Sequence, residues 1–256
     1  MSNKNLKQIY DRSCERSIPE NKSNSGPSIK PSILGSPCLR KVYYSYNKAP
    51  EDIPFPLTSS RITSLGNAIG KMLFDAFDKQ GVVVRFRKPD GTYHVDQHTG
   101  EVDFEFRLTS PELGIRLGKI DAVLILDDGL WLGEFKSIND RGFKELKAPK
   151  GDHTIQGVLY LYLFNKALKE GEFKHIPELA KFDKANGIRF LYYYKDKSEL
   201  KEFFITTADE LFRQIVLKIE QVKWFSENNQ VPPPTEDYCR TCAYQFRCQK
   251  NKKAND

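Results

Sequence analysis

Apolar and polar positions follow two different periods along this chain, one of two residues and one of three to four residues. Phe104, Phe106 and Leu108 alternate with charged residues, which is typical of a strand with one solvated face. Other segments carry apolar residues at helical spacing. We therefore expect helices at residues 63–79, 153–169 and 208–225, strands near 81–86, 93–95, 102–108 and 188–194, and a hairpin at 118–136.

Length and composition predict a single folded domain. The chain has 256 residues, of which 39% are hydrophobic, enough to build one core. Residues 1–30 are polar and include a stretch rich in Asn, Ser, Gly and Pro, so we expect a flexible tail there. The domain then spans residues 31–256, with its core at about 61–200 and cysteine-bearing segments at 31–48 and 232–250.

The expected hairpin at residues 118–136 gathers charged side chains in an otherwise apolar segment. An acidic turn signal at residues 127–129 separates two apolar runs. With the last two of these residues as the loop, the ladder places Asp121 opposite Lys136. Glu134 and Lys136 then share one face with Asp121 diagonal to Glu134, whereas a slip of one residue would turn Asp121 away.

Two carboxylates and a lysine on one face of an apolar hairpin indicate a divalent metal and a bound phosphate. Burying them costs desolvation energy, which a bound ion offsets. Asp121 and Glu134 offer the oxygens that Mg²⁺ or Mn²⁺ prefers, and Lys136 would hold the attacking water or neutralise developing charge. The alternative is a solvated ion pair on an edge hairpin. Val123 and Leu132 disfavour it because they make the same face apolar.

The expected helix at residues 153–169 carries a polar pair in an apolar setting. Gln156 and Tyr160 lie four residues apart and therefore share one helix face. Apolar residues lie nearly all round this helix, so we expect it to be buried. A buried glutamine needs a partner, either the backbone of the core or a functional site, and the residues alone leave both open.

Four of the five cysteines form a candidate metal site. Cys239, Cys242 and Cys248 are spaced C-x2-C-x5-C near one end of the chain, and Cys38 lies near the other. With no secretory signal pattern, thiolate ligands are favoured over disulfides. Such ligands would close a tetrahedral zinc site or hold one [4Fe-4S] cluster, and the spacing alone does not separate the two. Cys14 lies outside this pattern.

The residues of the expected hairpin resemble a known nuclease motif. Asp121, a turn and Glu134-X-Lys136 are similar to the PD-(D/E)XK nuclease superfamily, and Gly118-X-Ile-Asp resembles its RecB-like branch. The resemblance implies an α/β, restriction-endonuclease-like core of helix, three-stranded sheet, helix and strand, followed by a C-terminal helix and the cysteine cluster. It also implies that Asp121, Glu134 and the Phe135 carbonyl bind the metal ion.

The RecB-like branch further implies roles for the helix residues. Its members are similar in placing a Gln-X-X-X-Tyr pair beside the metal site, so Gln156 and Tyr160 would contact DNA or the catalytic lysine. Residues 65–66 in the first expected helix resemble the start of the family's Leu-Gly-X-X-X-His, but Gly70 stands where the metal-binding histidine would be. We therefore expect one protein ligand fewer at the metal.

The cysteine arrangement resembles that of iron–sulfur nucleases, namely the CRISPR-associated exonuclease family and the AddB-type helicase–nucleases. In both, a distant N-terminal cysteine and a C-terminal trio bracket the nuclease core, and the Cys-X-X-Lys-X-Tyr-Tyr context of Cys38 is similar too. The resemblance favours a [4Fe-4S] cluster over zinc. The expected role of the cluster is structural, tying the two ends of the domain together.

Net charge and missing motifs narrow the function. The formal net charge of +6 is modest and suits a nucleic-acid partner. No run resembles a transmembrane segment, so we expect a cytoplasmic protein without a membrane partner. The sequence has no Gly-rich loop of the kind that binds ATP phosphates, which argues against helicase activity.

These patterns predict a metal-dependent DNA nuclease, expected to be an exonuclease on single-stranded DNA or DNA ends. DNA repair or recombination, CRISPR adaptation and phage DNA processing are the settings considered, and the first two would bring protein partners. The alternative is a catalytically weakened, nuclease-fold DNA-binding or adaptor protein with a zinc or iron–sulfur staple. In that reading Gly70 marks lost catalysis.

Overall fold

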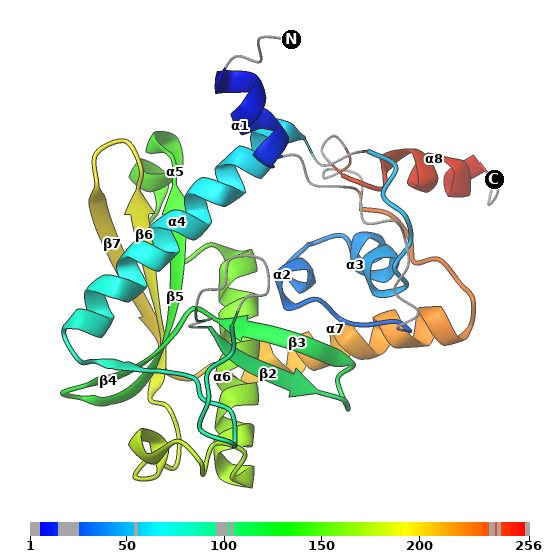
Figure 1. Ribbon diagram of the computed structural model, residues 1–256. Coiled ribbons are helices and arrows are strands. Elements are labelled where there is room, and N and C mark those ends of the chain that lie inside the picture. Colours follow the sequence, from blue (N-terminus) through cyan, green and yellow to red (C-terminus); the bar gives the residue numbers. More distant parts are fainter. Residues whose placement is uncertain are drawn as a thin grey trace.

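A five-stranded mixed sheet and a separate two-stranded sheet carry the strands of the described part of the chain (Figure 1). The structure is a computed structural model, and it describes residues 6–14, 26–53, 56–95, 102, 105–235, 239 and 242–253. In the larger sheet the strand order is β1-β4-β5-β6-β7, where β5 and β6 run parallel and the other neighbours antiparallel. Its strands are β1 (Val83–Val84), β4 (Ala122–Leu126), β5 (Gly129–Ile138), β6 (Gly187–Tyr194) and β7 (Glu199–Ile205). The smaller sheet pairs β2 (Phe106–Ser110) with β3 (Ile115–Ile120).

Two long helices cover opposite faces of the five-stranded sheet (Figure 1). Helix α4 (Leu57–Lys79) packs against a cluster that includes Trp131 and Phe135 of β5. Helix α6 (Gly151–Glu170) packs on the other face and forms part of the main core. Because side chains alternate along a strand, Glu134 points to the α6 face.

The remaining helices surround this core. Helix α6 also contacts α7 (Asp209–Glu227) and α2 (Pro31–Leu34), which explains why it is apolar on nearly every side. No helix within the described ranges is long and apolar enough to cross a membrane. The other helical segments are α1 (Leu6–Cys14), α3 (Leu39–Tyr46), α5 (Asp140–Glu145), the 3-10 turn η1 (Pro177–Leu179) and α8 (Gln245–Lys253).

The first strand of the predicted hairpin is divided at Asp121. Strand β3 ends at Ile120 and pairs with β2, whereas β4 begins at Ala122 and pairs with β5 in the other sheet. Asp121 therefore lies at the corner where the chain passes from one sheet to the other.

The register predicted for the hairpin is wrong. Leu126 pairs with Gly129, so the ladder places Asp121 opposite Glu134 and not opposite Lys136. The predicted loop is displaced because Gly129, with φ of 122°, already begins β5. A displacement of two residues keeps every side chain on its face, so Asp121 and Glu134 still share the face that was predicted.

The predicted order of helix, three strands, helix and strand is confirmed. Elements α4, β1, β4, β5, α6 and β6 follow one another, with β2 and β3 inserted after β1. The sequence pattern does not reveal β7, an edge strand on which Leu200 and Phe204 are exposed. The strand predicted at residues 93–95 forms only isolated bridges, and the one predicted at 102–108 begins at Phe106, with residues 103–104 outside the described ranges.

Helix α1 lies within the segment for which the sequence predicts a flexible tail. Asp11 in α1 forms ion pairs with Lys7 and with Arg61 of α4, so this part of the segment contacts the core. Residues 1–5 and 15–25 lie outside the described part of the chain.

Candidate functional site

The division of the hairpin places two carboxylates across from each other. Asp121 follows β3 and falls opposite Glu134 in the continued β4–β5 register. Its Oδ2 atom accepts a hydrogen bond of 2.6 Å from the backbone N–H of Phe135. Lys136, two residues further along β5, forms an ion pair with Oε1 of Glu134. The structure thus brings Asp121, Glu134 and Lys136 together, and we call these three residues the carboxylate site.

Burial dominates the electrostatics of the carboxylate site. Glu134 is only 1% exposed, and burial is the main reason that the pKa of both carboxyl groups is raised, that of Asp121 to about 7. The charge of Glu134 raises the pKa of Asp121 further, and Lys136 acts in the opposite direction on both. Burial alone would lower the pKa of Lys136, but the two carboxylates outweigh it and raise that pKa above its ordinary value. Because the site holds two carboxyl groups and only one lysine, a bound cation would stabilise the deprotonated carboxylates.

The donor set fits a hard divalent cation. The Oε2 atom of Glu134 is buried and has no hydrogen-bond partner among the described residues, which is costly unless a cation or proton reaches it. In the part of the chain that the structure describes, no three His, Cys, Asp or Glu side chains lie close enough together to hold an ion by themselves. Asp121, Glu134 and the Phe135 carbonyl would therefore share the ion with water and substrate oxygens, as Mg²⁺ commonly requires.

The predicted polar pair of α6 lies against β3. Gln156 Nε2 donates to the Tyr160 hydroxyl at 3.2 Å, and the backbone N–H of Lys119 donates to the same oxygen at 3.4 Å. Burial, followed by the charge of Glu134, raises the pKa of Tyr160 to about 12. A Cβ at Gly118 would lie 2.9 Å from Cε1 of Tyr160. The glycine of the Gly-X-Ile-Asp pattern therefore has a packing role, because it lets Tyr160 approach the strand that leads to Asp121.

A further acid lies across the smaller sheet from Asp121. The β2–β3 register places Glu105 opposite Asp121, and Glu105 forms an ion pair with Lys119. The charge of Glu105 helps to raise the pKa of Glu134, whereas Lys119 lowers that of Asp121. Sequence reasoning assigned neither residue a role. The sequence places both residues on expected strands, but it gives no signal for the pairing of β2 with β3 that brings Glu105 to the Asp121 corner.

The glycines of α4 differ in their surroundings. A Cβ at Gly70 would meet no atom within 4 Å, whereas one at Gly66 would lie 3.3 Å from the hydroxyl of Ser137. Gly66 therefore lets α4 approach the end of β5, directly after Lys136. Gly70 has room for a side chain but supplies no ligand of its own.

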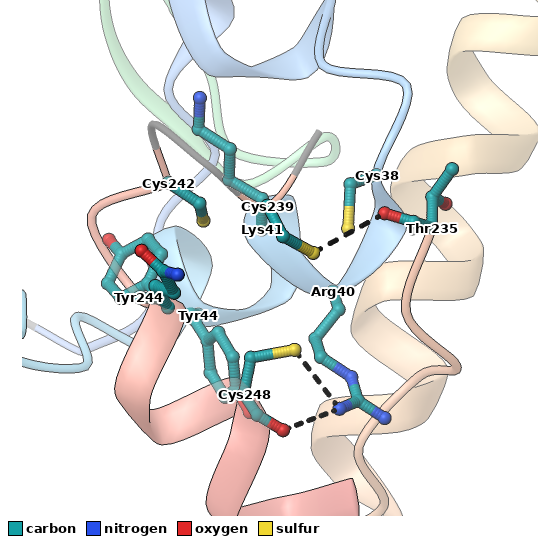
Figure 2. Close-up of a pocket in the computed structure, with 10 residues that line it drawn as sticks. Cys38, Arg40, Lys41, Tyr44, Thr235, Cys239, Cys242, Tyr244 and Cys248 are labelled. Atoms are coloured by element: carbon teal, nitrogen blue, oxygen red, sulfur yellow. Dashed lines mark hydrogen bonds between the residues drawn. The ribbon is translucent and has the colours of Figure 1, made fainter. Parts of the chain in front are cut away.

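The four predicted cysteine ligands line one pocket, which we call the cysteine pocket (Figure 2). Cys38 is the N-cap of α3, Cys239 and Cys242 precede α8, and Cys248 lies within α8. All four are free thiols. They do not form a ready ligand group at the present distances, as judged on the described residues. The pocket nevertheless joins the two ends of the domain.

A buried arginine lies against the cysteine pocket. Arg40 is 3% exposed, and its Nη1 atom donates to Sγ of Cys248 at 3.3 Å (Figure 2). Its Nε atom donates to the Pro232 carbonyl at 2.5 Å. Among the described residues no carboxylate pairs with Arg40. A buried guanidinium is costly without an anion. Thiolates, as in a cysteine-ligated zinc or iron–sulfur site, would supply the negative charge, so the pocket fits either group.

Comparison with known proteins matches the family model of the PD-(D/E)XK nuclease superfamily to residues 83–249. This span contains the carboxylate site and the C-terminal cysteine trio, and it begins after α4 and Cys38. Among solved structures, the chain is similar to one titled "Crystal structure of SSO0001", with 16% sequence identity and a TM-score of 0.50, over 96% of this chain and 98% of that chain. At this identity the likeness concerns the fold alone. No curated protein matches the chain.

Proposed function

The chain belongs to the PD-(D/E)XK nuclease superfamily, and from that premise we propose that it is a metal-dependent deoxyribonuclease acting on single strands or DNA ends. The superfamily implies a hydrolase that cleaves nucleic acid. The observation that carries the proposal is the buried carboxylate site, in which Asp121 lies opposite Glu134 and Lys136 pairs with Glu134. The net charge of +6 supports a polyanionic substrate.

Each residue of the carboxylate site has its own task in phosphodiester hydrolysis. Asp121, Glu134 and the Phe135 carbonyl would hold Mg²⁺ or Mn²⁺, which supplies polarisation of the phosphate and a lowered pKa of the attacking water. The hydrogen bond from the Phe135 N–H keeps Asp121 in place. Because both carboxylates raise its pKa, Lys136 keeps its proton. It therefore orients the attacking water and balances charge developing on the phosphate, and it is not the base.

Gln156 and Tyr160 would support the carboxylate site from α6. The Tyr160 hydroxyl accepts hydrogen bonds from Gln156 and from the Lys119 backbone, and its raised pKa keeps it protonated. Its own proton is then available to a substrate oxygen. This arrangement supports the role that the resemblance implies for the pair, contact with DNA or with the catalytic lysine.

Cleavage of labelled single-stranded and duplex DNA in Mn²⁺ tests the proposed activity. The wild type should degrade DNA, and Lys136→Ala should be slower by at least about a hundredfold because the charge that balances the phosphate is lost. The matched control is Lys144→Ala, which removes a lysine of α5 whose ion pair is with Asp140. This control should cleave as the wild type does. Equal cutting by the wild type and Lys136→Ala would refute the catalytic assignment.

We further propose that the four cysteines bind a [4Fe-4S] cluster with a structural role. Support comes from the shared cysteine pocket, from the buried Arg40 beside Cys248, and from the resemblance to iron–sulfur nucleases. Zinc is the alternative, because four thiolates suit either group. Analysis for iron, zinc and acid-labile sulfide in protein purified without oxygen separates them. Iron and sulfide in similar amounts are expected, and zinc alone would reject the cluster.

The motif patterns support a place in the RecB-like branch, near its CRISPR-associated and AddB-type members. Gly118-X-Ile-Asp and the Gln156 to Tyr160 spacing carry this part of the proposal. The settings that it covers are DNA repair or recombination, CRISPR adaptation and phage DNA processing, with protein partners in the first two.

A second candidate function is a DNA-binding or adaptor protein that has lost catalysis. Gly70 in place of the family's histidine favours it, as does the absence, within the described residues, of a ready group of three ligands. This candidate predicts that the wild type retains DNA but does not cleave it in any divalent metal.

A further inference from the structure

His153 lies at the edge of the carboxylate site, where neither the family motif nor the proposed mechanism uses it. Its ring stacks on Tyr192, with ring centroids 5.6 Å apart and an interplanar angle of 29°. Tyr192 of β6 lies directly beside Lys136 of β5 in the parallel ladder. His153 therefore stacks on the residue that neighbours the catalytic lysine in the ladder.

The hydrogen bonds of Tyr192 determine which nitrogen of His153 carries the proton. The backbone N–H of Lys150 donates to the Tyr192 hydroxyl at 3.0 Å, and Nδ1 of His153 lies 2.8 Å from the same oxygen. Tyr192 is fully buried, and the described residues offer its hydroxyl no third partner. The phenol proton must therefore go to Nδ1, because it would otherwise have no acceptor. A neutral His153 then carries its own proton on Nε2.

Burial and two nearby lysines keep this imidazole neutral. Burial is the main cause that lowers the pKa of His153 to about 4, and the charge of Lys136 lowers it further. Lys150 acts in the same direction, and Asp152 in the opposite one. At neutral pH the ring is therefore an uncharged donor.

The neutral ring has one donor left, its Nε2–H group. Among the described residues it has no hydrogen-bond partner, and the nearest carboxylate oxygen, on Asp152, is 4.0 Å away. The side chains of His153 and Lys136 are both partly exposed, at 21% and 22%. Positions 153, 156 and 160 of α6 fall on one helix face, so His153 extends the row formed by Gln156 and Tyr160.

We propose that His153 is a further substrate-binding residue, whose neutral Nε2–H donates to a phosphate oxygen of the DNA strand next to the carboxylate site. Tyr192 is the positioning residue that fixes the tautomer. The inference rests on the proposed nuclease function. It adds a contact that contributes binding without a positive charge, unlike a contact from lysine or arginine.

Binding of a fluorescent single-stranded oligonucleotide, measured in Ca²⁺ so that affinity is read separately from cleavage, tests this role. His153→Phe keeps the ring but removes the donor, and it should weaken binding by about tenfold to a hundredfold, the scale of one hydrogen bond to a charged group. His153→Gln, which offers an amide N–H near the position of Nε2, should recover most of the loss. The slope of affinity against salt should be the same in all variants, because a neutral contact releases no counterion.

Tyr192→Phe provides a second variant that leaves His153 itself in place. It should weaken binding, because the tautomer of His153 is no longer fixed by the Tyr192 hydroxyl. The double variant with His153→Phe should bind only slightly more weakly than His153→Phe alone. The matched control is Tyr194→Phe, on the same strand, whose hydroxyl donates to Asp140 and not to His153. This control should bind as the wild type does.

Unchanged binding by His153→Phe would overturn the inference. A salt dependence of binding that is weaker in His153→Phe than in the wild type, by about one charge, would also overturn it, because it would mean that the ring binds as a cation. In either case a wild type that binds and cleaves DNA would leave the nuclease proposal standing. A wild type that binds no DNA would count against both.

Discussion

The carboxylate site and the cysteine pocket differ in how they are built, and they carry opposite excess charges. The carboxylate site comes from neighbouring strands within residues 121–136 and is enclosed by the sheet and α6. The cysteine pocket joins Cys38 to a trio some 200 residues later, and its ends are held by contacts such as Arg40 to Cys248, 208 positions apart. One site is part of the fold, whereas the other brings the two ends of the fold together.

The two sites also differ in the sign of their excess charge. The carboxylate site has two acids for one lysine, and the raised pKa values of its carboxyl groups indicate that a bound cation would stabilise it. The cysteine pocket is lined by Arg40 and Lys41 and by no carboxylate among the described lining residues. We therefore expect the carboxylate site to lower the stability of the fold in return for its chemistry. We expect the cysteine pocket to raise stability through the metal or cluster that we propose it binds.

Glu134→Gln gives the largest expected effect and acts on chemistry far more than on stability. The substitution keeps the size of the side chain but removes one ligand, so cleavage of DNA in Mn²⁺ should fall by about a thousandfold or more. Stability should change by no more than about 1–2 kcal/mol, because Asp121 remains to balance Lys136. Cleavage rates and urea unfolding of the same samples measure both. A variant that unfolds but cleaves normally when folded would reverse the comparison.

Cys248→Ser should act in the opposite way, on stability before chemistry. Losing one ligand should release the bound metal and lower the melting temperature by about 10 °C. The matched control is Cys14→Ser, since Cys14 is not part of the four-cysteine pattern. Metal content and thermal unfolding are the measurements. Full metal content in Cys248→Ser would contradict the assignment of the cysteine pocket.

The pH dependence of stability sharpens the electrostatic half of the comparison. The pKa of Asp121 is raised from 3.8 to about 7, so the folded state holds a proton that the unfolded state has lost. This contribution is present below about pH 4 and is lost as pH rises through 7. His153, with a pKa lowered to about 4, acts in the opposite direction between pH 4 and 6.5.

The informative quantity is therefore the difference between the wild type and Asp121→Asn in EDTA. From pH 5 to 8 the wild type should lose stability relative to this variant. Added Mn²⁺ should reduce that loss in the wild type, because the ion binds the deprotonated carboxylates. Parallel pH curves for the two proteins would show that Asp121 is not a perturbed acid.

Gly70→Ala gives the smallest expected effect and tests the open position on α4. The residue has open space around it, so alanine should raise the free energy of unfolding by about 0.5–1 kcal/mol and leave cleavage unchanged. Gly66→Ala should gain less or lose stability, because its Cβ would press on the hydroxyl of Ser137. Urea unfolding of both variants is the check, and an equal gain in both would contradict the contact at Ser137.

The carboxylate site could be read from the sequence because its residues are close in the chain. Strand alternation places Asp121 and Glu134 on one face even when the register is wrong by two residues. The corner at Asp121 could not be read, since it depends on the pairing of β3 with β2 in a separate sheet. The roles of Gly118 and Glu105 follow from that corner and were hidden with it.

The cysteine pocket shows the complementary limit. Spacing identifies the four thiols, but it does not reveal that Arg40 reaches across to Pro232 and Cys248, because those contacts depend on the tertiary fold. The sequence does not predict strand β7 for a related reason. Its apolar residues Leu200 and Phe204 are exposed on an edge strand, so its pattern does not show the usual buried face. The position of His153 on Tyr192 likewise depends on the β5–β6 ladder.

Calorimetric titration of the purified protein with Mn²⁺ tests most directly the claim that the corner at Asp121 builds a metal site. The wild type should bind the ion, Asp121→Asn should bind it much more weakly, and Cys248→Ser should bind it as the wild type does, to the extent that it folds. Equal Mn²⁺ binding by the wild type and Asp121→Asn would contradict the account.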